Sequence, residues 1–412
     1  MGRTAGEKSG KVGLRAHRLR TLLAVAGILL VAANLRAPIT SVGPLLGSIR
    51  ESFGFSSGVA GLLTAVPLLA FAAISPIAPG IARGISIERA LFGALVLLGV
   101  GISLRSTYLP AALFGGTLIL GIAIALGNVL LPSLIKRDFP ANVGLITGMY
   151  TATMSTFAAL ASGVSVPLAA GLGVGWRGSL LFWTLPVFAG ILLWLPRLRT
   201  RARGARPPRR SNADSSIWRS ALAWQVTLFM GLQASIFYVS ITWLPSILRE
   251  EGLATAQAGW MVSIMQFVAI PAALIAPVIA ERLTSQRLVL VCAAASSAAG
   301  ITGLLLFAGA TVLPWIILLG VGQGACISLA LTLFSLRAPD SGRAAELSSM
   351  AQSVGYLLAA LGPAAFGILR DLSGSWSAPL ASLLGIAFAL AFVSLGAGRD
   401  KLVPVSGTAP SS

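Results

Sequence analysis

The sequence predicts an all-α integral membrane protein with twelve transmembrane helices, arranged as two pseudo-symmetric six-helix halves around a central cavity. Three observations predict this fold class. The chain is 56% apolar and only 10% charged, whereas about 25% of the residues of a soluble domain are charged. Apolar runs of about 20 residues, the length that spans a bilayer, recur along the chain. The first and second halves of the sequence also resemble each other.

Twelve apolar segments are long enough to cross a membrane, and each is interpreted as one helix. A helix satisfies its own backbone groups, which a bilayer core requires because it holds no water. A cleaved signal peptide is not favoured, since the first apolar run is longer than a signal core. The predicted spans are 21–47, 59–81, 89–105, 109–135, 144–168, 178–196, 219–248, 256–280, 287–308, 312–335, 344–369 and 376–396.

The lysines and arginines are divided unequally between the two sides of the predicted bundle. With the N-terminus inside, most of the 30 fall on the cytoplasmic side, as the positive-inside rule requires. This predicts a multi-pass protein of a bacterial-type cytoplasmic (cell) membrane with both termini cytoplasmic. The arginines expected outside are Arg50, Arg105, Arg177, Arg249 and Arg370. Tryptophans near span ends are predicted to be interfacial anchors, namely Trp176, Trp194, Trp218 and Trp376.

One stretch, RLRTRARGARPPRRSNADSSIWRS (197–220), is basic, interrupted by prolines and without apolar periodicity. It predicts a flexible cytoplasmic linker between the two halves, with contact to anionic lipid as the alternative role. The predicted organisation is a basic cytoplasmic tail (1–20), an N-terminal half (21–196), the linker (197–218), a C-terminal half (219–396) and a cytoplasmic tail (397–412).

Three alignments relate the halves to each other. PGIARGISIERAL (79–91) aligns with PVIAERLTSQRLV (277–289), and LIKRDFP (134–140) aligns with LFSLRAP (333–339). Near the end of the first span of each half, Pro44 aligns with Pro245. Parallel repeats of this kind are typical of transporters whose halves rock about a site near the membrane midplane.

The short basic loop after the second span of each half resembles the signature loop of the major facilitator superfamily, Gly-x-x-Ala-Asp-Arg-x-Gly-Arg-Arg. The first copy departs from that pattern, because Arg83 stands where the family has an acid. Matching positions are Gly80, Ala82 and Arg89 in the first copy, and Ala280, Glu281, Arg282 and Arg287 in the second. The resemblance implies a gating role for the charged positions, Arg83, Arg89, Glu281, Arg282 and Arg287.

The segment NLRAPITSVGPLL (34–46) is similar to the first span of the cyanate/2-nitroimidazole transporter subfamily. The resemblance implies a secondary active or facilitative transporter that works by alternating access. Its expected solute is small and anionic or polar, either cyanate-like or a nitroheterocycle. The alternative is a multidrug-type exporter of heterocyclic compounds, although the fifth predicted span (144–168) lacks the Gly-Pro signature of proton-coupled drug antiporters.

Within that segment, Arg36 lies inside an apolar run. A central arginine costs roughly 2.5–3.5 kcal/mol on insertion scales. Arg36 is ~22 Å along a helix from Thr21, too far for its side chain to reach the interface. The acidic residues fall in tails, loops or span ends, and Glu346 alone lies slightly inside a predicted span. We therefore predict that Arg36 binds the ligand through its fork of donors, with a structural ion pair as the alternative.

Further candidates for substrate binding are polar groups inside apolar spans. Thr40 shares a helix face with Arg36, whereas Asn34 reaches the same cavity only if the helix is distorted at Pro38. The repeat counterpart of Arg36 is Phe237, so the site is predicted to be charged on one side only. In spans that the resemblance places around the cavity, the candidates are Asn128, Tyr150, Gln233, Tyr238, Gln323, Gln352 and Tyr356. Hydrogen bonding between helices is their alternative role.

Several function classes are not favoured. No cluster of His, Cys and carboxylate groups occurs in any span, so we expect no enzyme activity, metal site or cofactor. The net charge of +18 is spread over short loops, which does not indicate nucleic-acid binding. The expected partners are a small-molecule substrate and the lipid bilayer, and the protein is expected to function as a monomer.

Overall fold

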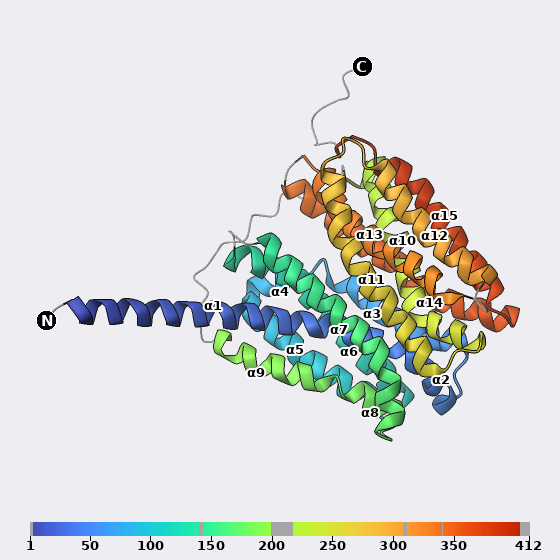
Figure 1. Cartoon of the computed structure of the whole chain (residues 1–412), viewed down its shortest axis with the longest axis horizontal. Helices are drawn as coiled ribbons and strands as arrows, with labels where there is room; N and C mark the ends of the chain where they lie inside the picture. Colours follow the sequence, from blue (N-terminus) through green and yellow to red (C-terminus); the bar gives the residue numbers. More distant parts are fainter. Residues whose placement is uncertain (1–2, 140–142, 199–216, 308–310, 340, 404–412) are drawn as a thin grey trace, which may run out of the picture.

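The computed structural model describes residues 3–139, 143–198, 217–307, 311–339 and 341–403. These residues form helices joined by short loops, and no strand occurs among them. Twelve of the described segments are long and apolar enough to cross a membrane, which confirms the predicted all-α class and span count. The helices form two bundles that lie side by side, the first blue to green and the second yellow to red (Figure 1).

The first half contains α1 (Arg3–Thr40), α2 (Val42–Phe53), α3 (Ser57–Ile74), α4 (Ala78–Ile85), α5 (Ile87–Arg105), α6 (Pro110–Asp138), α7 (Val143–Gly171), α8 (Gly175–Leu181) and α9 (Thr184–Leu198). The second contains η1 (Ile217–Arg219), α10 (Ala221–Glu250), α11 (Thr255–Glu281), α12 (Arg287–Phe307), α13 (Val312–Leu336), α14 (Ser341–Ser373) and α15 (Ser377–Ala397). Most of the predicted linker, from 199 to 216, lies outside the described residues.

The first predicted span is divided at Ser41, between α1 and α2. Pro44 cannot donate to the carbonyl of Thr40, and that oxygen instead accepts a hydrogen bond from Ser162 Oγ of α7 at 3.2 Å. The carbonyl of Pro38 accepts from Arg105 Nη1 of α5 at 2.6 Å. Arg105, which was predicted on the outer side of the membrane, is only 1% exposed, because its guanidinium bonds to this interrupted segment.

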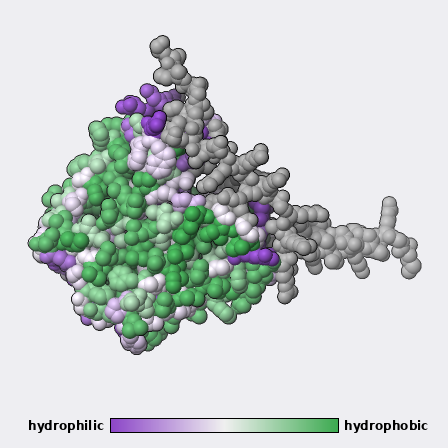
Figure 2. All heavy atoms as spheres, turned by 180° about the vertical axis from the view of Figure 1, so that it is seen from behind, coloured by the Kyte–Doolittle hydropathy of each residue, from purple (hydrophilic) through white to green (hydrophobic). Residues whose placement is uncertain are grey.

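Much of the surface is apolar, as a lipid-facing surface must be. Figure 2 shows a broad hydrophobic face with hydrophilic residues toward its edges. Large side chains such as Phe188 (60% exposed) and Phe392 (76% exposed) stand free of the protein core. In water such exposure would promote association, whereas in a bilayer it costs nothing.

The expectation that tryptophans near span ends anchor the interface is wrong for three of the four. Trp218 is 52% exposed, but the other three are at most 8% exposed. An indole N–H inside a protein requires an acceptor, and each of the buried rings has one. The pairs are Trp176 with Ser52 Oγ, Trp194 with the Glu88 carbonyl, and Trp376 with the Glu250 carboxylate. These rings therefore hold helix ends together.

Equivalent close helix contacts occur in both halves. A Cβ atom at Gly101 of α5 would lie 2.7 Å from the backbone nitrogen of Leu120 in α6. At the repeat-related position in α12, a Cβ atom at Gly300 would lie 2.7 Å from the nitrogen of Leu319 in α13. Both helix pairs therefore depend on a glycine for their close approach, which supports the parallel repeat inferred from the sequence.

The halves meet mainly where α3 packs on α14 and where α7 packs on α11. We call the side where α9 ends and η1 begins the junction side, and the opposite side the far side. On the far side, the Asp371 carboxylate of α14 accepts from the backbone N–H groups of Ser57 (3.1 Å) and Gly58 (2.8 Å) in the first turn of α3. A carboxylate at a helix N-terminus is stabilised by the helix dipole, so this contact joins the halves.

One turn further along α3, Gly61 contacts the backbone of α14, and a Cβ atom there would lie 2.7 Å from Ala364 Cα. We expect Gly61→Ala to cost about 1–3 kcal/mol, since backbone atoms cannot move aside as side chains do. Thermal unfolding of the purified protein measures this. Gly93→Ala in α5 is the matched control, because a Cβ atom there meets nothing within 4 Å. Equal melting temperatures for the two variants would contradict the importance of this contact.

Candidate functional site

A cavity of about 710 Å³ lies between the two halves. Its lining begins near the middle of the spans, at Arg36 of α1 and Phe237 of α10, and reaches the junction-side ends of other helices at Ser75, Ser133 and Ser348. The contacts of α3 with α14 and of α7 with α11 close the far side. The cavity thus extends from the centre of the bundle toward one side, as one state of an alternating-access cycle requires.

Arg36 lies at the inner part of this cavity. Its Cζ atom is 4.9 Å from the centroid of the Phe237 ring, so the cation of the first half lies over its own repeat counterpart from the second. A contact of this kind contributes about 0.5–2 kcal/mol. Among the residues that the structure describes, no carboxylate lies within ion-pairing distance of Arg36.

Most predicted site residues line this cavity together with Arg36. They are Asn128, Tyr150, Gln233, Tyr238, Gln323, Gln352 and Tyr356. Asn34 does not reach it, because it lies on the face of α1 that is turned toward α9. There its amide donates to the carbonyls of Leu30 (2.7 Å) and, on α9, Pro186 (3.1 Å). Thr40 lies just beyond the cavity and donates to Ala158 O of α7 at 2.9 Å. Thr40 therefore joins α1 to α7 beside the cavity and does not line it.

Aromatic rings form part of the cavity wall. Tyr356 lies edge-on to Phe71, with ring centroids 5.5 Å apart, and is 6.5 Å from the ring of Tyr238. Tyr238 in turn lies 5.2 Å from Phe237, the ring beneath Arg36. A continuous aromatic surface therefore leads up to the guanidinium, and it offers a face on which a planar ligand can stack.

Sequence reasoning missed Gln266 of α11, which lines the cavity and is 4% exposed. Its Nε2 donates to Ala158 O (3.3 Å) and Ser162 Oγ (3.1 Å), both across the interface on α7. Candidates were taken from the spans that the family resemblance places around the cavity, and α11 is not one of them. The signal was the glutamine itself, a polar group within the apolar run MVSIMQFVAIP.

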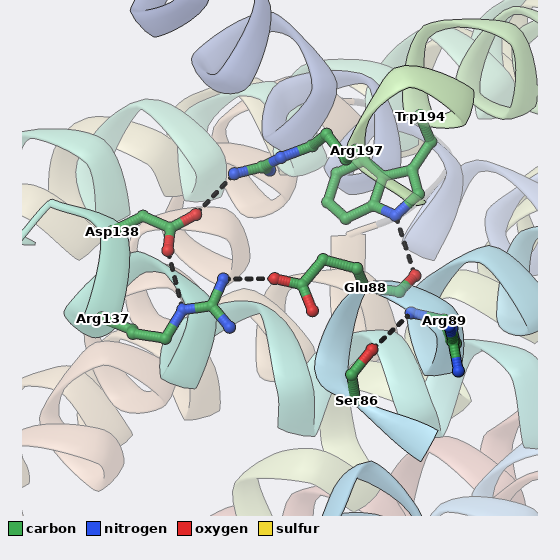
Figure 3. A network of polar contacts seen from close by, with 7 residues as sticks. All are labelled: Ser86, Glu88, Arg89, Arg137, Asp138, Trp194 and Arg197. Atoms are coloured by element: carbon green, nitrogen blue, oxygen red, sulfur yellow. Dashed lines mark hydrogen bonds and ion pairs between the residues drawn. The ribbon is translucent and has the colours of Figure 1, made fainter. Parts of the chain in front are cut away.

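The charged positions of the two signature loops form no ion pair among the described residues. Arg89, Glu281, Arg282 and Arg287 are exposed at the junction side, and the side chain of Arg83 lies outside the described part of the structure. Ion pairing on this side occurs instead in what we call the charge cluster, Glu88, Arg137, Asp138 and Arg197 (Figure 3). Of this cluster, only Glu88 is adjacent in the sequence to a predicted loop residue, Arg89.

In the charge cluster, Arg137 of α6 bonds to Glu88 of α5 at 2.5 Å and to Asp138 at 2.8 Å. Asp138 also bonds to Arg197 of α9 at 2.5 Å. Burial lowers the pKa of Arg137, but the hydrogen bonds and charges of Asp138 and Glu88 outweigh it and raise the pKa above its ordinary value. The charge cluster therefore ties three helices of the first half together at the junction side.

The second half has a related arrangement in which an amide accepts from the arginine. Arg337, which aligns with Asp138 in the repeat, donates to the Gln286 amide oxygen and to the Ala397 carbonyl, the latter at 3.0 Å. Gln286 aligns with Glu88 in the repeat. A neutral amide thus does in the second half what a carboxylate does in the first.

Twelve membrane-spanning helices in two repeats around a central cavity are the architecture of a membrane transporter. The chain belongs to the Major Facilitator Superfamily, whose family model matches residues 24–363. This confirms the family predicted from the signature loops, and its members are transporters and not enzymes.

The chain is similar to several bacterial transport proteins. The chain is 46% identical over 387 residues to the uncharacterized transporter YycB of Bacillus subtilis (strain 168), with 94% of this chain and 96% of that protein covered. It is 45% identical over 380 residues to the 2-nitroimidazole transporter of Escherichia coli (strain K12), covering 92% and 96%. Identity to the cyanate transport protein CynX of the same strain is 26% over 350 residues, covering 85% and 90%.

Among solved structures, the bacterial homologue of the human lysosomal transporter Spinster, in an inward-facing and unoccupied conformation, matches with a TM-score of 0.74. The match covers 94% of this chain and 99% of that one at 16% identity. It establishes the shared fold and no more.

Substitutions in the charge cluster test its contribution to stability. Asp138→Asn removes a carboxylate that two arginines share, and we expect a loss of about 1–3 kcal/mol. Glu88→Gln should cost less, since Gln286 already serves Arg337 in this way. Thermal unfolding at neutral pH compares the two variants. A larger loss for Glu88→Gln would show that the neutral arrangement of the second half is not transferable.

Proposed function

We propose that the protein is a secondary active or facilitative transporter that moves a small anionic or polar solute by alternating access, with Arg36 as the ligand-binding cation. The observation that carries this proposal is the position of Arg36, in a central cavity and without a carboxylate partner among the described residues. A guanidinium binds planar anions and nitro groups through paired N–H donors. The names of two relatives, a 2-nitroimidazole transporter and a cyanate transport protein, support a nitroheterocycle or a cyanate-like ion.

The orientation follows from charge. Helix α9 ends and η1 begins at the junction side, so the basic stretch that connects them in the sequence starts and finishes there. The positive-inside rule therefore assigns this side to the cytoplasm of a bacterial-type cell membrane. On this assignment both termini are cytoplasmic, and the described conformation faces inward. The halves 21–196 and 219–396 then act as the two rocking units, and the loops carrying Arg89 and Arg287 close the cytoplasmic side in the opposite state.

A second candidate is export of larger heterocyclic compounds. The aromatic wall formed by Phe71, Tyr238 and Tyr356 supports it, since stacking surfaces accept many ring systems. The two functions differ in selectivity. A transporter of one small solute should ignore bulky aromatic cations, whereas a multidrug-type exporter should move them in an Arg36-independent way.

Replacing Arg36 tests its role directly. Arg36→Ala should lower uptake of 2-nitroimidazole into proteoliposomes about 10- to 150-fold, the effect of losing a hydrogen bond to a charged group. Arg36→Lys should recover little, because an ammonium cannot make the paired contact. Arg219→Ala, an exposed arginine outside the cavity, is the control. An Arg36→Ala protein that fails to fold would support a structural ion pair instead.

The second test asks whether transport is coupled to protons. The described residues that line the cavity include no Asp, Glu or His, although a buried carboxylate usually serves as the proton relay in proton-coupled transporters. We expect the uptake rate to be insensitive to an imposed pH gradient in proteoliposomes. Strict dependence on that gradient would overturn this expectation and direct attention to Asp138 and Glu346 near the junction side.

A further inference from the structure

Two buried amide oxygens in the second half have no hydrogen-bond donor among the described residues. Gln266 of α11 is 4% exposed and Gln323 of α13 is 2% exposed. Both side chains line the central cavity, and Oε1 of each is left without a partner. Buried acceptors of this kind are costly to leave unpaired.

The nitrogen end of each amide donates a hydrogen bond, and for Gln266 this bond fixes the orientation of the amide. Nε2 of Gln266 donates to the Ala158 carbonyl at 3.3 Å, and a carbonyl cannot receive an oxygen in its place. Nε2 of Gln323 donates to Ser297 Oγ at 3.1 Å, and that hydroxyl is itself directed to the Ala293 carbonyl. Turning the Gln266 amide would place its oxygen against the Ala158 carbonyl. In the arrangement that the structure shows, each amide therefore leaves one acceptor that the surrounding protein does not use.

These acceptors lie on the half opposite Arg36. The carbonyl oxygen of Ala158 connects Gln266 to the helix that carries Arg36. It accepts hydrogen bonds from Gln266 and from Thr40, which lies one helix turn beyond Arg36. Gln323 lies on α13 where Gly320 and Gly324 pack closely against the backbone of α11. The cavity is therefore polarised, with a cation on the first half and neutral acceptors on the second.

We propose that the second half selects ligands by a hydrogen-bond donor. The ligand class is a small planar ring with an anionic or acceptor group for Arg36 and an N–H or O–H group for Gln266 and Gln323. This inference rests on the proposed function and makes it more specific. A nitroheterocycle with a free ring N–H has both features, whereas the cyanate ion carries no donor and leaves the acceptors unpaired.

The ligand test uses purified full-length protein and three probes of nearly equal chemistry. These are 2-nitroimidazole, its 1-methyl derivative, which lacks the N–H, and its 4-methyl derivative, which keeps the N–H at equal bulk. Affinities are measured by calorimetry at a pH at which the ring nitrogen retains its proton. The 1-methyl compound should bind about 10-fold or more weakly than the 4-methyl compound, as expected for an unpaired buried acceptor.

Variants assign the effect to the two amides. Gln266→Leu and Gln323→Leu should each reduce the preference for the N–H compound and leave the affinity for the 1-methyl compound within about threefold. Gln257→Leu, exposed on the same helix α11, should keep the full preference. Should one leucine variant fail to fold, the other still tests the proposal.

The outcomes separate two failures. Equal affinity for the two methyl compounds, or a preference that survives both leucine substitutions, overturns the donor-selection inference and leaves the transport proposal intact. Absence of binding by all three probes, with Arg36 present and the protein folded, counts against the proposed nitroheterocycle function itself.

Discussion

A guanidinium at the middle of a membrane-spanning helix cannot face lipid, and the rest of the architecture follows from where this protein places it. Arg36 lies over the ring of Phe237, so its charge is located between two halves that each bury their own polar contacts. An ion pair there would neutralise the charge and leave nothing for a ligand. The contact with the ring instead stabilises the cation by about 0.5–2 kcal/mol. A bidentate anion can bind the guanidinium more strongly than the ring does.

The same location determines how a ligand can influence the two halves. Thr40, one turn from Arg36, donates to the Ala158 carbonyl within the first half, and Gln266 donates to that oxygen across the interface. A group that binds Arg36 and Gln266 together therefore acts on both sides of the contact that rocking must open. A solute can shift such an equilibrium only through contacts that differ between the two states, and on the proposed mechanism the contact between Gln266 and Ala158 would open in one of them.

The predictable parts of the site are residues of a type that is unusual in a membrane-spanning segment. Arg36 in an apolar run and the matched prolines of the repeats stand out in the sequence. Gln266 was missed because its helix was not counted as lining the cavity, and Trp194 was misassigned because a ring at a span end fits lipid and protein equally well. Asn34 shows the general limit. Its sequence position is two residues from Arg36, yet helix geometry turns it toward α9.

The two halves differ in charge at two repeat-related positions. Where the first half has Arg36 the second has Phe237, and where the first has Glu88 the second has Gln286. At these two positions the charged residue lies on the first repeat, and the second repeat has a ring and an amide. A fixed charge attracts ligands over a distance but discriminates poorly among anions, whereas neutral groups discriminate by shape and by hydrogen bonds at contact. If the repeats divide these tasks as proposed, the second half can change its selectivity without moving Arg36.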